Sequence, residues 1–310
     1  MDNLTLEFSD DVLRILILDD SGKISFKDET DLGFNMNDYS YFKNRDELVD
    51  NFNEKFNGLL KEPNLVFKEA GVLIDTSQAF LNVFPVDFQE DAGSINSHIL
   101  WELSNYFPET YKNYNIKYYR LNNQFLTDGI DQILLIAVDK NKIEFIKSLC
   151  NGCGIKIKSV DIDQFVVEKC LKVFYPEELK NSTLLLIGCK NSRLDFSLIS
   201  GGTIKYYDYE IINTLNFTNL LVKQMNFYNS VFEVNRPGKI FLYGDRNAEV
   251  VKKFLNEEFP DLLVQYINPV DTKDTKDTKD NNKNFSKFSP LFGLALKNLS
   301  KKLENNFRNL

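Results

Sequence analysis

The sequence contains only one histidine and four cysteines, which removes components of most nucleophilic and acid–base active sites. Histidine is the usual general base near neutral pH, and His98 falls within a predicted helix. Cys150 and Cys153 form a C-x-x-C motif, but no second pair of ligands accompanies it, and Gly152 and Gly154 indicate a helix end. The sequence therefore disfavours a Ser-His-Asp or Cys-His enzyme and indicates structural cysteines.

Long apolar runs and a surplus of positive charge are also absent. No window reaches the roughly 18 apolar residues of a membrane-spanning helix, and the start, Met1-Asp2-Asn3, lacks the pattern of a signal peptide. We therefore expect a cytoplasmic protein that is at most peripheral to the inner membrane. The net charge of -8 disfavours nucleic acid as a partner, because phosphate binding requires an excess of lysine and arginine. A basic peptide partner is compatible with this charge.

Two stretches of the sequence share one pattern and one length. Residues Leu4–Ile24 and Leu184–Ile204 each contain an apolar strand, a polar turn, a second strand, a glycine turn and the start of a third strand. The glycine turns, Ser21-Gly22 and Gly201-Gly202, suit the positive φ of a β-hairpin. The pattern predicts two related halves.

Helices and strands alternate after each of these stretches, which predicts an α/β protein with mixed sheets. In the predicted helix Arg45–Leu60, apolar residues recur with a helical period and define one buried face. The other predicted helices are Gly93–Tyr106, Lys140–Cys150, Gln164–Phe174, Phe217–Val231 and Ala248–Phe259. The other predicted strands are Val66–Ile74, Phe80–Val86, Asn115–Leu121, Ile130–Val138, Ile155–Asp161, Ile204–Ile211, Lys239–Tyr243 and Leu262–Ile267.

The last part of the chain combines a polar repeat with an apolar helix. Residues 271–280 read DTKDTKDTKD and have no apolar side chain to offset the entropy of ordering, so we predict a low-complexity loop over 268–288. Pro290 suits the first position of a helix, which we predict over 290–306 with an apolar stripe. The stripe indicates docking on the core, and an amphipathic helix on a membrane surface is the alternative.

Four segments carry a further signal: HILWELSNYFPET, DQILLIAVDK, VDIDQFVVEKCL and SPLFGLAL. Together they resemble the PilM family of type IV pilus assembly proteins, in the actin-like superfamily, and its relative GspL. The resemblance implies a duplicated actin-like (ribonuclease H-like) fold with an inserted subdomain in the first half and a reduced second half. It divides the chain into a first half at 1–180, with the insertion at about 64–140, and a second half at 181–310.

Proteins of the actin-like fold hold ATP and Mg²⁺ with two Asp-x-Gly hairpin turns and a Gly-Gly turn. Here Glu7 stands at the first acidic position and Leu186 at the second, so the resemblance implies a degenerate site. The residues left to contact a nucleotide are Ser9, Asp10, Gly188, Lys190, Asn191 and Gly244. The helical subdomain that walls the cleft is missing, because Phe217 begins a helix almost directly after Ile211. We therefore expect no bound cofactor, with ATP and Mg²⁺ as the alternative.

PilM-like proteins bind the tail of a PilN-like inner-membrane protein in a groove between the core and the inserted subdomain. The resemblance implies that this groove is lined by 66–86 and by the helix that contains His98. The residues expected to contact the tail are Trp101, Tyr106, Phe107 and Val83, because aromatic residues dominate interface energies. These aromatic side chains could instead belong to the core.

Two functions follow from these expectations. The predicted function is a non-catalytic cytoplasmic scaffold that binds the tail of an inner-membrane partner. The alternative is a nucleotide-binding actin-like ATPase or phosphotransferase that uses Glu7, Asp10 and Asp195 as a rearranged metal site.

Overall fold

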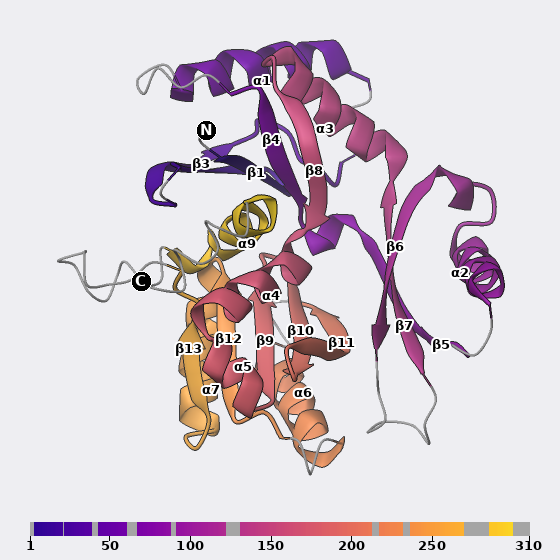
Figure 1. Ribbon diagram of the computed structural model, residues 1–310, viewed down its shortest axis with the longest axis vertical. Coiled ribbons are helices and arrows are strands. Elements are labelled where there is room, and N and C mark those ends of the chain that lie inside the picture. The colour runs from indigo at the N-terminus through magenta and orange to yellow at the C-terminus, as the bar shows by residue number, and fades with distance from the viewer. Residues whose placement is uncertain are drawn as a thin grey trace. The chain divides into compact units, whose positions relative to one another are not determined.

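The computed structural model describes residues 3–20, 22–38, 43–60, 67–87, 91–121, 131–212, 217–231, 236–269 and 285–299 (Figure 1). Some predicted features lie outside these ranges: Ser21 of the first glycine turn, the start of the strand at 66, the repeat at 271–280 and the end of the last helix at 300–306. The chain forms two compact units. The first contains Met1–Ala79, Val138–Phe174 and Pro290–Leu310, and the second contains Phe80–Ala137 and Tyr175–Ser289.

A five-stranded mixed sheet forms the centre of the first unit, with the strand order β3-β2-β1-β4-β8. Its strands are β1 (Asn3–Ser9), β2 (Val12–Leu18), β3 (Ile24–Asp31), β4 (Glu69–Ile74) and β8 (Lys156–Ile162). β1 and β2 pair antiparallel, whereas β4 runs parallel to both β1 and β8. The apolar runs of β1 and β2 are buried on both faces, whereas the alternating polar residues of β3 place it at an edge.

The second unit contains a sheet with the same strand order and the same strand directions, β11-β10-β9-β12-β13. Its strands are β9 (Leu184–Cys189), β10 (Arg193–Ser200), β11 (Thr203–Ile211), β12 (Lys239–Gly244) and β13 (Leu263–Tyr266). Gly201 and Gly202 have φ of 57° and 69°, as the predicted hairpin requires. The predicted duplication of the hairpins is therefore confirmed.

The helices follow the two sheets in the same order. In the first half they are α1 (Arg45–Leu60), α3 (Lys140–Gly152) and α4 (Asp163–Phe174), and in the second half α6 (Phe217–Val231), α7 (Arg246–Glu258) and α9 (Ser289–Asn298), with a short α5 (Pro176–Asn181) before β9. Along α1, Phe52, Phe56 and Leu60 are buried, which confirms the predicted face. The predicted mixed α/β fold is confirmed.

A three-stranded sheet with one helix lies between β4 and α3 in the chain, in the region predicted as an insertion. Its order is β5-β7-β6, built from β5 (Phe80–Pro85), β6 (Tyr114–Leu121) and β7 (Gln132–Asp139). α2 (Ala92–Tyr106) covers one face of this sheet (Figure 1), and its Ile95, Ile99 and Leu103 join the core formed with Phe84 and Ile133. Both β5 and β6 are therefore edge strands.

The helix α9 is buried along most of its length within the first unit. Every residue from Pro290 to Leu296 is buried, and the Asn3 side chain donates to the Ala295 carbonyl at 3.2 Å. A Cβ at Gly293 would lie 2.2 Å from the Val166 carbonyl oxygen, so only glycine allows this approach. Docking on the core is confirmed for this part of the helix. No described helix is long and apolar enough to cross a membrane.

Candidate functional site

The first hairpin turn, at Ser9 and Asp10, is held by side chains of its own unit. The Ser9 hydroxyl donates to the Asp75 carboxylate at 2.7 Å, and Asp10 accepts from the Asn37 amide at 2.6 Å and from the Ser77 hydroxyl at 3.3 Å. Burial and then the nearby Asp75 carboxylate raise the pKa of Asp10. The polar groups of this turn therefore form an internal network.

Three carboxylate side chains lie close together near this turn. Oxygen atoms of Glu7, Asp75 and Asp163 lie within 4.8 Å of one another, and all three residues are buried. Arg14 pairs with Glu7 at 3.3 Å, and the Thr76 backbone N–H donates to Asp163 at 3.0 Å. Oxygen ligands of this kind suit a divalent cation. The turn itself has Phe8 and Ser9 where an actin-like turn offers glycine N–H groups.

The second hairpin turn is connected to the start of α7. The Asn247 amide donates to the carbonyls of Lys190 and Asn191 at 2.6 and 3.2 Å. The Lys190 side chain is buried, and its ammonium lies 4.8 Å from the centre of the Tyr243 ring. Gly188 lies within β9, opposite Asp195 and Tyr243 in the neighbouring strands. These predicted cofactor residues therefore contact other parts of the second unit.

Gly244 ends β12 with a φ of 115°, a conformation that side chains rarely adopt. A Cβ at this position would lie 2.1 Å from the Cys189 carbonyl oxygen at the end of the neighbouring strand β9. The contact between the two strand ends is sufficient reason for the glycine, independent of any nucleotide.

Asp195, the third acid of the alternative metal site, is held by two partners in the second unit. The Arg193 guanidinium donates to its carboxylate at 2.8 Å, and the Tyr207 hydroxyl donates to the same oxygen at 2.5 Å. Burial and then Asp195 raise the pKa of Tyr207 well above its usual value, so the phenol stays protonated as a donor. Glu7 and Asp10 belong to the first unit, so no single unit brings the three acids together.

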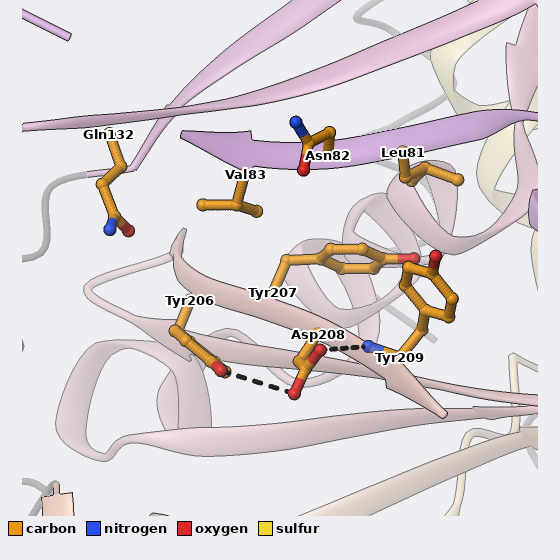
Figure 2. Close-up of a pocket in the computed structure, with 8 residues that line it drawn as sticks. All are labelled: Leu81, Asn82, Val83, Gln132, Tyr206, Tyr207, Asp208 and Tyr209. Carbon is orange, nitrogen blue, oxygen red and sulfur yellow. Dashed lines mark hydrogen bonds between the residues drawn. The ribbon is translucent and has the colours of Figure 1, made fainter. Parts of the chain in front are cut away.

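A pocket of about 450 Å³ opens in the second unit between two edge strands. The lining residues are Leu81, Asn82 and Val83 of β5, Gln132 of β7, and Tyr206, Tyr207, Asp208 and Tyr209 of β11 (Figure 2). Leu81, Val83 and Gln132 lie on one face of the β5-β7-β6 sheet, because Gln132 pairs with Pro85, and this face lines the pocket. From β11, four consecutive residues line it. The volume lies in the range of ligand pockets. We call this pocket the β5–β11 groove.

The predicted partner-binding residues lie at different places in the second unit. Val83 lines the β5–β11 groove, and alternation along β5 places it on the face opposite to Phe84, which packs under α2. Trp101 is 59% exposed and Tyr106 is 52% exposed on α2. Phe107 is half-buried and packs on the core under α2.

The sequence analysis missed the side of the groove that β11 supplies. The run Tyr206-Tyr207-Asp208-Tyr209, aromatic and acidic on an edge strand, was its only signal. Aromatic residues on an exposed strand are common, so the run alone does not indicate a site.

Comparison with known proteins identifies the family. The sequence model described as type IV pilus assembly protein PilM matches residues 9–258, which is most of the chain. This chain belongs to the PilM family. A search of curated proteins finds no match for this PilM-family chain.

Solved structures share the fold of this family member. The "PilM-PilN type IV pilus biogenesis complex" matches with a TM-score of 0.65 and 14% identity, over 95% of this chain and 98% of that one. A protein of Bacteroides thetaiotaomicron with an actin-like ATPase fold and unknown function matches with a TM-score of 0.51 and 14% identity, over 86% of this chain and 91% of that one. These likenesses confirm the actin-like fold.

Proposed function

We propose that this chain is a non-catalytic cytoplasmic scaffold of type IV pilus assembly that binds the tail of a PilN-like inner-membrane protein. Membership of the PilM family and the fold shared with a PilM in complex with PilN support the choice of partner. The tail is an extended segment that inserts into the β5–β11 groove.

The observation that carries the proposal is that two edge strands face one groove. An edge strand presents unpaired backbone N–H and C=O groups that an incoming strand can use. Leu81 and Val83 point from β5 toward β11, and Tyr207 lies opposite them (Figure 2). A peptide that paired with one of these edge strands would gain backbone hydrogen bonds, and Leu81 and Val83 would add apolar contacts. Trp101 and Tyr106, exposed on α2, offer further apolar contact area.

We propose that the chain is non-catalytic because of the groups found at its two hairpin turns. Buried carboxylates lie next to the first turn. In the second turn, two backbone carbonyls accept hydrogen bonds from the Asn247 amide. Neither offers the glycine N–H groups on which phosphoryl transfer depends. If ATP bound at about one hundred times its dissociation constant, the fold would gain about 2.7 kcal/mol. We therefore expect no change in the melting temperature on adding Mg-ATP, and a clear upward shift would contradict this part of the proposal.

The scaffold is tested by calorimetric titration with a synthetic peptide of the partner's cytoplasmic tail. We expect binding to the unaltered protein and at least about tenfold weaker binding to Val83→Asp, because a carboxylate would enter the groove beside Asp208. Leu263→Asp is the matched control, since Leu263 is exposed on β13, an edge strand away from the groove. Melting temperatures verify that both variants fold. No binding by the unaltered protein would refute the scaffold.

A further inference from the structure

The β5–β11 groove carries one acidic side chain and no basic one among its lining residues. Asp208 is the acid, and the others are apolar side chains, amides and tyrosines. The chain as a whole has a net charge of -8. Among the lining residues themselves, the only charge is therefore the negative charge of Asp208.

Asp208 is held in place by neutral donors. One carboxylate oxygen accepts from the Tyr209 backbone N–H at 2.8 Å. The other accepts from the Gln224 amide at 3.0 Å and from the Tyr206 hydroxyl at 3.4 Å. These bonds fix the carboxylate without neutralising it, because none of the donors carries a charge.

Glu210, the next acidic residue along β11, is paired with a lysine, whereas among the described residues Asp208 is not. Glu210, on the same side of β11, pairs with the Lys223 ammonium at 3.3 Å and shares the Gln224 amide. No lysine or arginine of the described part of the chain pairs with Asp208. A half-buried carboxylate with fixed geometry and no cation is a site for a cation from outside.

The tyrosine rings of the groove add a second attraction for a cation. The negative face of an aromatic ring attracts ammonium and guanidinium groups, and arginine most often. Such a contact already exists in this strand, since the Arg193 guanidinium lies 3.7 Å from the centre of the Tyr209 ring. Tyr206 lies on the same side of β11 as Asp208, whereas Tyr207 points to the other side, toward β5 (Figure 2).

We propose that the β5–β11 groove is a binding site for an arginine or lysine side chain carried on an extended peptide, with Asp208 as its counter-ion. The peptide lies along the edge of β11, and its basic side chain reaches the Asp208 carboxylate beside the Tyr206 ring. This inference rests on the proposed function and adds to it the chemistry of the tail segment that the groove selects.

The test uses two probes so that the inference and the proposed function can fail separately. The first probe is acetyl-Val-Arg-Val-amide, compared with the peptide in which neutral citrulline replaces arginine. Amide chemical shifts of 81–83 and 206–209 are followed by NMR. We expect shifts with the arginine peptide and at least about tenfold weaker binding of the citrulline peptide, as for loss of a charge-assisted hydrogen bond.

The substitution Asp208→Asn should weaken binding of the arginine peptide by a similar factor, because it keeps the side-chain shape and removes the charge. Asp261→Asn is the matched control, since Asp261 is exposed and outside the groove lining. If the unaltered protein binds the arginine and citrulline peptides with equal affinity, the inference is overturned, and this test needs no protein variant.

The second probe is the partner's tail peptide. If the tail binds the unaltered protein and Asp208→Asn equally well, the inference is overturned and the scaffold proposal stands. If the tail does not bind but the arginine tripeptide does, the scaffold proposal is refuted and the cation site remains. If neither binds, both are wrong.

Discussion

The Cys189 carbonyl oxygen occupies the space in which a side chain at Gly244 would begin, since a Cβ there would lie 2.1 Å away. Gly244 also has a φ of 115°. We expect Gly244→Ala to lower the free energy of unfolding by at least about 2 kcal/mol, because it adds a backbone clash to an unfavourable conformation. Urea unfolding measures the loss.

Gly201→Ala is the comparison at a glycine that has a positive φ but no close neighbour. Gly201 has a φ of 57°, but a Cβ there would meet nothing within 4 Å. Its replacement should cost only about 1 kcal/mol, for the left-handed conformation alone. Equal losses for the two variants would show that the contact with Cys189 is unimportant.

A pair of helical glycines should respond in opposite directions. A Cβ at Gly293 in α9 would lie 2.2 Å from the Val166 carbonyl oxygen, whereas one at Gly58 in α1 would meet nothing within 4 Å. Gly293→Ala should therefore destabilise the protein by roughly 2 kcal/mol or more. Gly58→Ala should stabilise it by up to about 1 kcal/mol, because alanine favours the helix. A denaturation midpoint that does not fall for Gly293→Ala would contradict the close packing of α9 on Val166.

Lys142 should give the stability a dependence on pH. Burial, only partly opposed by Asp139, Asp10 and Asp75, lowers the pKa of Lys142 from 10.5 to about 8. Between pH 8 and about 10.5 the unfolded chain therefore binds more protons at this residue than the folded chain, so its contribution to stability rises with pH.

The measurement is the difference in unfolding free energy between the unaltered protein and Lys142→Met. Tyrosines and cysteines titrate in the same range, but they are common to both proteins and cancel in the difference. We expect the difference to move in favour of the unaltered protein by about 1–3 kcal/mol from pH 7 to pH 10. A difference that stays constant or moves the other way would show that Lys142 is not desolvated.

Trp101 should contribute to partner binding and little to folding. It is 59% exposed on α2, so Trp101→Ala removes few core contacts. We expect the melting temperature to change by only a few degrees and the partner's tail to bind more weakly, since tryptophan is enriched at binding hot spots. Val250→Ala, at an exposed apolar position of α7, is the matched control. Unfolding of Trp101→Ala would place the side chain in the core.

Much of the fold could be predicted because its signals are local. The hairpins follow from apolar runs broken by Gly22 and by Gly201-Gly202, and α1 follows from the spacing of Phe52 and Phe56. Each signal lies within one short segment. The duplication could be predicted because the same local pattern occurs twice.

The groove could not be predicted, because it depends on segments far apart in the sequence. Val83 and Tyr207 share no pattern, and only the sheet order makes edge strands of both β5 and β11. The structural reason for Gly244 could not be predicted either. The sequence shows a glycine in a turn, whereas the close approach of Cys189 appears only when β12 pairs with β9.

Hydrogen exchange with and without the partner's tail peptide shows directly whether the tail pairs with β5 and β11. If the tail adds as a strand to the groove, amide exchange should slow in β5 (Phe80–Pro85) and β11 (Thr203–Ile211), while the other edge strands, β3, β6, β8 and β13, keep their rates. Tail binding that leaves β5 and β11 unprotected would contradict the account.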